Sequence, residues 1–596
     1  MIYRWSFSTR LLGAISMKGK PFRPLALAWL LFAGVSSAGA QFPALIKDVN
    51  RNPVAAKPSN PDHLVDLFGV TLFTADDGIH GKELWKTDGL PSHTCMVKDI
   101  QPGRASSRIS GGALSGGVLL FTADDGVHGA ELWRTDGTAQ GTAMVLDIVK
   151  GKGSSSPADF LSLGRTVFFT ADDGIHGREL WKTDGTAAGT RMVKDIWSGS
   201  GSSTVTGMVR LGGLVYFDAY DGIHGFELWR SDGTAAGTRM VKDIYPGIFS
   251  SNPGQLTALG ETLFFSASDG VHGWELWKTD GTAAGTRMVK DLWPGVHGAA
   301  PSDMTAFDGR VFFSAYEPLH GRELWMSDGT AGGTVLVKDI LPGTGSSLPS
   351  ELTPQWDTLY FTADDGVHGR ELWKSGGRGG NTLLVRDLRP GPGGSAPWDL
   401  TPVGTRFLYF SADDGSHGVE PWKTDGTSKG TAQLGDINPS GSSHPGGFTP
   451  SFGRVIFRAD DGRHGMEIWG IYTGAQARIF GPGWAGGAVP PLLSASDPVL
   501  GGSMEVRLAG LDPNRAGILL FGFPSSPASF GGEALFFLDR GKFFLPVVYV
   551  KGMKIPIPNG PGLNWVSLAV QGFAAPSKTS PLGVDFAGPV YLFLSH

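Results

Sequence analysis

The sequence predicts an all-β protein, with a β-propeller of about nine four-stranded blades followed by a small β-sandwich domain. Gly and Pro number 90 and 39 of 596 residues, about twice their average share, which indicates many turns. Each repeat carries four short apolar stretches between Gly- and Asp-rich turns, the pattern of a propeller blade. A Glu-Leu-Trp tripeptide recurs every 48 residues, with variants at the last two copies, and the tryptophans are Trp85, Trp133, Trp181, Trp229, Trp277, Trp325, Trp373, Trp422 and Trp469.

The first forty residues have the layout of a secretory signal peptide. Lys18, Lys20 and Arg23 precede the apolar run 25–35, and Ala-Gly-Ala at 38–40 offers a cleavage site. Eleven apolar residues are too few to span a bilayer of about 30 Å, and we expect no transmembrane segment after signal cleavage. The predicted location is therefore secreted or cell-surface. Removing this segment takes basic but no acidic residues from an already acidic chain, so we expect no nucleic-acid partner.

The four strands of a blade can be placed in the repeat at 251–295. They are expected at 253–259, 262–267, 275–277 and 287–292, with turn signals between them. We name the connections by strand order, so the B–C turn joins the second strand to the third.

An open β-solenoid is the alternative architecture, and side-chain alternation weighs against it. Successive residues of a strand point to opposite faces of the sheet. Leu84 and Trp85 are adjacent and both large and apolar, as are Leu263, Phe264 and Phe265. Such strands need burial on both faces, which a blade between two other blades provides.

The ends of the repeat region indicate how the ring closes. Residues 44–49 match the fourth strand of a repeat, such as 96–100, but precede the first complete unit. The ninth unit lacks a good fourth strand of its own. We therefore expect nine blades over 41–483, with the N-terminal strand completing the last blade. Nine exceeds the usual four to eight blades.

The sequence pattern changes after residue 483. The repeat motifs vanish, charge becomes sparse, and at least six short apolar runs are separated by Pro and Gly. Residues 484–596 are therefore predicted to form the small β-sandwich.

At this point the sequence resembles a known family. The text ELWKTDGTAAGT, with FTADDGIHG before it and RMVKDI after it, is similar to the bacterial ELWxxDGT-repeat family, some of whose members are called hyalin-like. The resemblance covers roughly 44–483. It implies an exported repeat protein and no established activity.

The Asp-Asp-Gly-x-His-Gly motif of the B–C turn suggests two interpretations. A turn uses Asp to accept backbone N–H bonds and Gly to adopt positive φ. A calcium site needs six to eight oxygens, and each turn offers few. We therefore expect no cofactor and keep calcium binding as an alternative, whose candidate ligands are Asp76, Asp77, Asp124, Asp125, Asp172, Asp173, Asp364 and Asp365.

A carboxylate pair recurs in each blade, for example Glu179 with Asp195. Such a pair suits acid–base chemistry in a glycosidase. An active site is normally singular, however, whereas this pair repeats, and no nucleophile elbow, phosphate loop or HExxH motif is present. We predict no catalytic residue and no enzyme.

Repeats four to six depart from the others by their aromatic residues. These rings suit flat, partly apolar ligands such as sugar rings or peptide side chains. The alternative is that they pack between blades. The ligand-binding candidates are Trp197, Tyr220, Tyr245, Phe249, Trp293, His297 and Tyr316.

The function predicted from these observations is that of an exported, non-catalytic binding or structural protein, a cell-surface or extracellular recognition or adhesion scaffold. Its partner would be a glycan or a protein ligand on the face of blades 4–6. The two alternatives are a calcium-binding repeat protein and a propeller-type carbohydrate-active enzyme.

Overall fold

The computed structural model describes residues 42–50 and 57–473, and beyond them only the backbone of short strands. Those strands are β37 (Leu492–Ala495), β38 (Val506–Ala509), β39 (Leu519–Gly522), β40 (Gly532–Asp539), β41 (Lys542–Phe544), β42 (Val548–Val550), β43 (Met553–Ile555) and β44 (Leu568–Ala569). The predicted signal peptide and the predicted sandwich domain lie outside the described residues.

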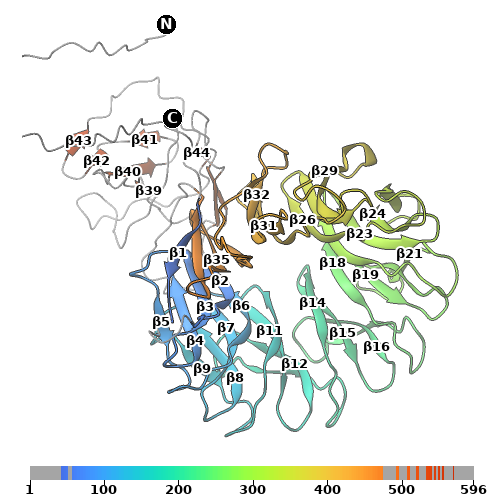
Figure 1. Ribbon diagram of the computed structural model, residues 1–596. Helices are drawn as coiled ribbons and strands as arrows, with labels where there is room; N and C mark the ends of the chain where they lie inside the picture. The colour runs from blue at the N-terminus through green and yellow to red at the C-terminus, as the bar shows by residue number, and fades with distance from the viewer. Residues whose placement is uncertain are drawn as a thin grey trace, which may run out of the picture. The chain divides into compact units, whose positions relative to one another are not determined.

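The described part of the repeat region forms nine four-stranded antiparallel sheets, which confirms the predicted nine-blade propeller (Figure 1). Blade 1 holds β2 to β5, and each later blade takes the next four strands. Blade 9 consists of β34, β35, β36 and β1, because the N-terminal strand pairs antiparallel with β36. The ring is thus closed by joining the two ends of the repeat region.

The first strand of each blade is the innermost, and it lies against the first strands of both neighbouring blades around the whole ring, β34 against β2 included. These strands are β2 (Asp62–Leu67), β6 (Ser110–Ser115), β10 (Ala158–Leu163), β14 (Thr206–Leu211), β18 (Gly254–Leu259), β22 (Ser302–Phe307), β26 (Ser350–Gln355), β30 (Trp398–Val403) and β34 (Gly446–Ser451).

The second and third strands form the middle of each blade and hold most of its buried residues. The second strands are β3 (Val70–Asp76), β7 (Val118–Asp124), β11 (Thr166–Asp172), β15 (Leu214–Tyr220), β19 (Thr262–Ser268), β23 (Arg310–Glu317), β27 (Thr358–Asp364), β31 (Phe407–Asp413) and β35 (Arg454–Asp460). The third strands are β4 (Lys82–Thr87), β8 (Ala130–Thr135), β12 (Arg178–Thr183), β16 (Phe226–Ser231), β20 (Trp274–Thr279), β24 (Gly321–Ser327), β28 (Arg370–Ser375), β32 (Val419–Thr424) and β36 (Met466–Tyr472).

The fourth strands form the outer edge. They are β5 (Cys95–Lys98), β9 (Ala143–Leu146), β13 (Arg191–Lys194), β17 (Arg239–Lys242), β21 (Arg287–Lys290), β25 (Val335–Lys338), β29 (Leu383–Arg386), β33 (Ala432–Gln433) and β1 (Ala44–Lys47). In blade 7 the C–D turn contains a short 3-10 helix, η1 (Gly379–Asn381).

The core lies between the blades. Tyr216 and Leu228 of blade 4 pack against Leu263, Phe265 and Trp277 of blade 5, and equivalent clusters form between the other blades. Adjacent apolar residues of one strand are therefore both buried, one against each neighbouring blade. Each such side chain contributes about 1.5–3 kcal/mol by leaving water.

A repeated lysine fastens neighbouring blades to each other. Lys98, at the end of β5, donates to the carbonyl of Thr142 in blade 2 at 2.7 Å and lies over the Trp133 ring. Lys47 of β1 makes the same contacts to Thr94 and Trp85 of blade 1. The closing strand is therefore held to both blades that it joins. No helix among the described residues has the length and apolar character needed to cross a membrane.

Candidate functional site

The B–C turns satisfy their own polar groups. Asp77 accepts the N–H groups of Ile79 and His80 at 2.9 and 2.8 Å, and its second oxygen lies 2.7 Å from Nδ1 of His80. Partial burial alone would raise the pKa of Asp77, but these hydrogen bonds outweigh it and hold the pKa below its usual value. The same bond to Asp77 raises the pKa of His80.

The calcium candidates all take part in such turns. Asp76, Asp124, Asp172 and Asp364 each accept the N–H group of the turn glycine at 2.7–2.8 Å. Asp125, Asp173 and Asp365 repeat the contacts of Asp77. Among the described residues, no group of three or more His, Cys, Asp or Glu side chains has an arrangement that fits a metal ion.

The B–C turn of blade 6 lacks the Asp-Asp-Gly sequence but keeps the contact between carboxylate and histidine. Glu317 replaces the second Asp and pairs with Nδ1 of His320, while its other oxygen accepts the N–H of Leu319. The longer side chain therefore reproduces the same His–carboxylate contact.

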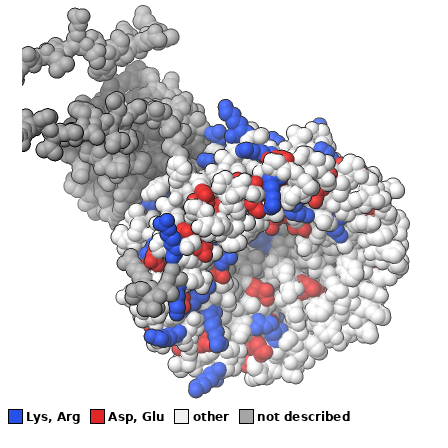
Figure 2. Space-filling model, in the orientation of Figure 1, with Lys and Arg blue, Asp and Glu red and all other residues white. Residues whose placement is uncertain are grey.

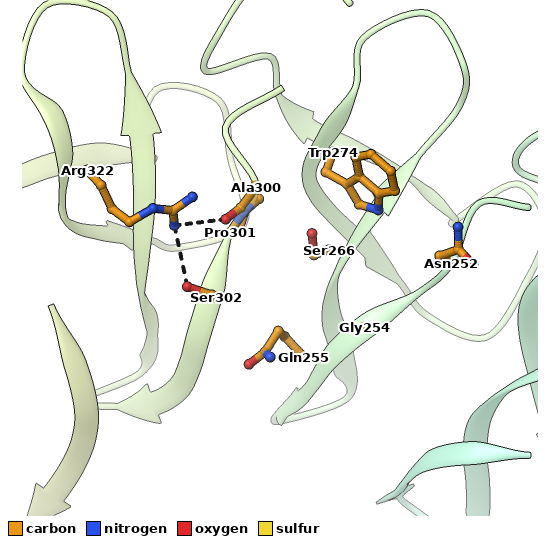
Figure 3. A pocket seen from close by; sticks show the side chains of 9 residues that line it. All are labelled: Asn252, Gly254, Gln255, Ser266, Trp274, Ala300, Pro301, Ser302 and Arg322. Carbon is orange, nitrogen blue, oxygen red and sulfur yellow. Dashed lines mark hydrogen bonds between the residues drawn. The ribbon is translucent and has the colours of Figure 1, made fainter. Parts of the chain in front are cut away.

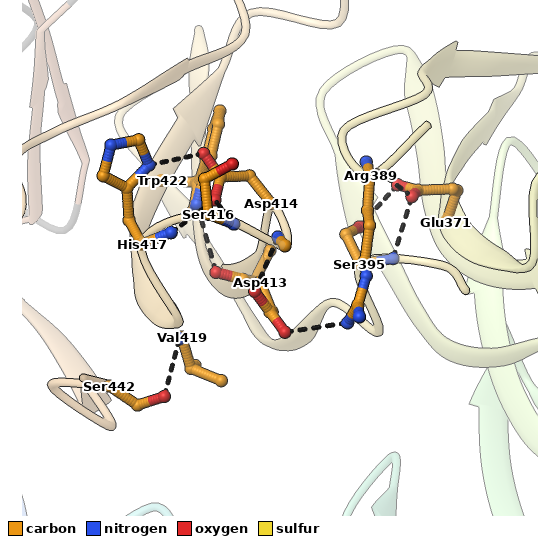
Figure 4. A network of polar contacts seen from close by, with 12 residues as sticks. Glu371, Arg389, Ser395, Asp413, Asp414, Ser416, His417, Val419, Trp422 and Ser442 are labelled. Carbon is orange, nitrogen blue, oxygen red and sulfur yellow. Dashed lines mark hydrogen bonds and ion pairs between the residues drawn. The ribbon is translucent and has the colours of Figure 1, made fainter. Parts of the chain in front are cut away.

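The glutamate of each Glu-Leu-Trp is buried and shapes the D–A loop. Glu179 accepts the N–H groups of Ile196 and Ser203 at 2.9 and 3.0 Å. Burial raises the pKa of Glu179 to about 7. One carboxylate oxygen of Asp195 accepts the N–H of Gly199 at 3.2 Å. In Figure 4, Glu371 holds the N–H and hydroxyl of Ser395 in the same way, beside an Arg389–Asp413 ion pair at 2.9 Å.

The predicted aromatic candidates form three groups at the boundaries of blades 3 to 6. Trp197 meets Tyr220 edge to face, with ring centroids 4.8 Å apart, and Tyr245 stacks on Phe249. Trp293 lies between His297 and Tyr316, at 4.8 and 4.7 Å. In each of the three groups, the ring that comes from the D–A loop also lies against the B–C turn of the next blade, as Trp197 does at Gly222. The rings contact one another across blade boundaries, and Trp197, Phe249 and His297 remain exposed.

The inner strands share an unusual backbone conformation but differ in the residue that adopts it. The second residue of each has positive φ, beside an irregularity in the strand pairing. A residue other than glycine in this conformation costs of order 1 kcal/mol. The nine residues with positive φ are His63, Gly111, Asp159, Gly207, Gln255, Asp303, Glu351, Asp399 and Gly447. Figure 2 shows acidic and basic atoms inside the central hollow of the propeller.

Asp218 is a second departure from uniformity. It stands on β15 at the position held by Thr or Ser in most other blades, and its Oδ1 is buried without a hydrogen-bond partner. Burial, with the nearby Glu227 charge, raises its pKa to about 8.

A pocket of about 440 Å³ lies between the inner strands of blades 5 and 6 (Figure 3). Trp274 and Arg322 stand on two sides of it, and Gln255 lines the wall between them. The Trp274 indole is 44% exposed although it lies in the middle of the repeat. The other lining residues are Asn252, Gly254, Ser266, Ala300, Pro301 and Ser302.

Arg322 brings a positive charge to this pocket with no carboxylate within 4.0 Å among the described residues. Its Nη1 donates to the carbonyl of Ala300 at 3.0 Å and, more weakly, to Ser302 Oγ and the carbonyl of Ser314. Burial lowers its pKa from the usual value, and an arginine nonetheless stays charged. The charge of the nearby Asp303 acts in the opposite direction on this pKa. The guanidinium is therefore fixed in direction, and no described carboxylate contacts it.

Sequence reasoning missed Trp274 and Arg322, although the repeat contained a signal. The residue before each Glu-Leu-Trp or its variant is Lys, Ala, Arg, Phe, Trp, Arg, Arg, Val and Met in turn. When one position varies inside a nearly constant motif, the fold does not require a particular residue type there.

No family model matches the chain, and no curated protein matches it in sequence. The resemblance to the ELWxxDGT-repeat family therefore stays a prediction.

Solved structures do resemble the chain. A puromycin hydrolase is 16% identical, with a TM-score of 0.32 and 61% of each chain covered. A structure from a study of two prolyl endopeptidases is 11% identical, with a TM-score of 0.36, and the match covers 60% of this chain and 55% of that one. A puromycin-hydrolyzing peptidase of Mycobacterium tuberculosis is 13% identical, with a TM-score of 0.31, and the match covers 63% of this chain and 60% of that one. The chain thus spans about three fifths of the proteins it matches.

These neighbours are peptidases, and they contradict two predictions from the sequence. The prediction of a non-catalytic binding or adhesion scaffold is corrected, and so is the prediction that the chain is not an enzyme. Both rested on the repetition of one carboxylate pair in the blades, whereas the second residues of the inner strands and Asp218 differ in kind from blade to blade. The likeness concerns the propeller fold alone, and it transfers no residue role or substrate to this chain.

Proposed function

We propose that the pocket between blades 5 and 6 binds, as ligand or substrate, an organic carboxylate that carries a large apolar group. The C-terminal end of a peptide is the class that fits this lining best. The observation that carries the proposal is that Trp274 and Arg322, which no described carboxylate contacts, face one cavity from adjacent blades.

The positive charge of Arg322 is the reason for expecting a carboxylate on the ligand. A partly buried cation that no carboxylate contacts gains from an anion, and a guanidinium offers paired N–H donors that match a carboxylate. The backbone carbonyl of Ala300 accepts from Nη1 at 3.0 Å and that of Ala299 from Nη2 at 3.4 Å, so the direction of the group is set before a ligand arrives. Such preorganisation lowers the entropic cost of binding.

The exposed indole of Trp274 is the reason for expecting a large apolar group on the ligand. An exposed Trp offers a large rigid contact face, and an aromatic pair adds about 0.5–1.5 kcal/mol beyond its buried area. Asn252, Gln255 and Ser302 supply amide and hydroxyl groups to the same cavity, which suits the backbone amides of a peptide. A volume of about 440 Å³ lies within the range of ligand pockets and limits the ligand to one or two residues.

Calorimetric titration with N-acetyl-phenylalanine and with its neutral C-terminal amide tests the proposal. We expect saturable binding of the acid and at least about tenfold weaker binding of the amide, since one charge-assisted pair is worth 1.4 kcal/mol or more. Equal binding of the two compounds, or no binding of either, would contradict it.

Two pairs of variants separate binding from folding. Arg322→Met should abolish the preference for the acid, whereas Arg370→Met should not, because Arg370 makes the same kind of bonds within blade 7 but does not line the pocket. Trp274→Ala should weaken both compounds, and Phe226→Ala, at the equivalent position of blade 4, should leave binding unchanged.

A further inference from the structure

The tips of the B–C turns expose aliphatic side chains at equivalent positions of seven successive blades. The x residue of each Asp-Asp-Gly-x-His-Gly motif, or its counterpart in blade 6, is 59–72% exposed. Surface aliphatic residues are ordinary when scattered, but a repeated set on one face marks an interaction surface. We call these residues the tip arc: Ile79, Val127, Ile175, Ile223, Val271, Leu319 and Val367.

The tip arc is interrupted only at blades 8 and 9, where Ser416 and Arg463 take the position. The D–A loops after blades 4 and 5 add Ile248, Phe249 and Val296, which are also exposed. Loops B–C and D–A lie at the same ends of the strands in an antiparallel blade, so these side chains extend the arc on one face.

The tips are held firmly. The N–H of Ile79 donates to Asp77 at 2.9 Å, and the same bond recurs at Val127, Ile175, Ile223, Val271 and Val367. A partner that covers them therefore loses little additional backbone entropy on binding.

The described strands next to the two ends of the propeller place those ends on the face opposite the tip arc. β36 starts at a B–C turn and runs away from the tip arc to Tyr472, after which the C-terminal segment follows. β1 runs in the opposite direction, so Phe42 precedes it on the far side as well. Both ends of the propeller thus lie on the face of the C–D turns.

We propose that the tip arc is the contact surface of a face-to-face dimer with a second copy of this chain. The proposal does not depend on the ligand of the pocket. A run of seven successive blades is symmetric about its middle blade, blade 4, so a two-fold axis through that blade brings Ile223 against Ile223 of the second copy. The same axis places Arg463 opposite Ser416 of the second copy, so polar meets polar and apolar meets apolar.

The exposed area is sufficient for such a dimer. An aliphatic side chain buries roughly 60–120 Å² when fully covered, by the area equivalent of its transfer free energy. Scaled by their exposed fractions, the tip arc and the three D–A residues together offer roughly 400–800 Å² on each copy, and the upper end reaches the about 800 Å² per partner of a standard interface.

The charge of the chain favours a protein over a lipid surface. The chain has a net charge of −6 at pH 7, and each tip follows a turn carboxylate, which is Glu317 in blade 6 and an aspartate in the other six blades. Anionic membranes repel such a surface.

Analytical ultracentrifugation of the full chain tests the dimer. We expect a concentration-dependent dimer, and the triple variant Ile175→Ser, Ile223→Ser, Val271→Ser should raise the dimer dissociation constant at least about tenfold. Its thermal midpoint should match that of the wild type, because the three side chains are exposed. Trp356→Ser, an exposed residue of the A–B turn on the other face, should leave the dissociation constant unchanged.

Cross-linking identifies the face and its symmetry. In a Cys95→Ser background, Ile223→Cys should form an intermolecular disulfide under mild oxidation, and Trp356→Cys should not. A wild-type chain that stays monomeric up to about 100 µM, a dimer that persists in the triple variant, or cross-linking through position 356 instead would overturn the proposal. Binding of the monomer to phosphatidylcholine vesicles through the same residues would overturn it in favour of a lipid partner.

Discussion

Substitution of Ile46 tests whether the N-terminal strand closes the ring. Ile46 lies on β1 and is buried in a cluster that contains Phe73 and Trp85 of blade 1 with Ile456 and Ile468 of blade 9. Ile46→Ala removes three carbons, each worth about 0.8 kcal/mol by transfer from water, and leaves a cavity between two blades. We expect a loss of about 2–4 kcal/mol in the free energy of unfolding.

Urea unfolding followed by tryptophan fluorescence measures this loss. Val241→Ala is the matched control, since Val241 holds the same position on β17 in the interior of the ring, and it should cost about 1–3 kcal/mol. Phe42→Ala, an exposed residue just before β1, should cost less than about 0.5 kcal/mol. If Ile46→Ala matched Phe42→Ala while Val241→Ala was costly, β1 would not be part of the ring.

Three further predictions follow from the polar and aromatic groups. Asp218→Ser should stabilise the protein by on the order of 5 kcal/mol at pH 8 and by little at pH 4, because a folded-state pKa of about 8 removes stability as pH rises from 4 to 8. An equal difference at both pH values in thermal unfolding would contradict this. Calcium titrated into chelator-treated protein should show no saturable heat, since the turn carboxylates are bonded within their turns, and several ions bound per chain would refute that account. Replacing Trp197, Tyr245 and Trp293 with Ala should lower the thermal midpoint, and an unchanged midpoint would mean that these rings do not pack between blades.

The propeller was predictable because repetition exposes its pattern. Adjacent apolar residues such as Phe264 and Phe265 demand burial on both faces, and only a sheet between two others provides it. The stray strand at the N-terminus carried the information that β1 pairs with β36. Both inferences use local chemistry that recurs along the chain.

The pocket was less predictable because it depends on distances between blades. Trp274 and Arg322 are 48 residues apart, and nothing in one repeat shows that their side chains share a cavity. Trp197 and its neighbours, which the sequence offers as a binding patch, contact one another at blade boundaries, and their role in binding stays a prediction. Aromatic composition marks the right blades but does not separate packing from exposure.

A crystal structure of the propeller with N-acetyl-phenylalanine tests the central claim most directly. The account predicts the carboxylate within hydrogen-bond distance of the Arg322 guanidinium and the phenyl ring against Trp274, between blades 5 and 6. A ligand bound in the axial channel or at another blade boundary, with the pocket at Arg322 unoccupied, would contradict it.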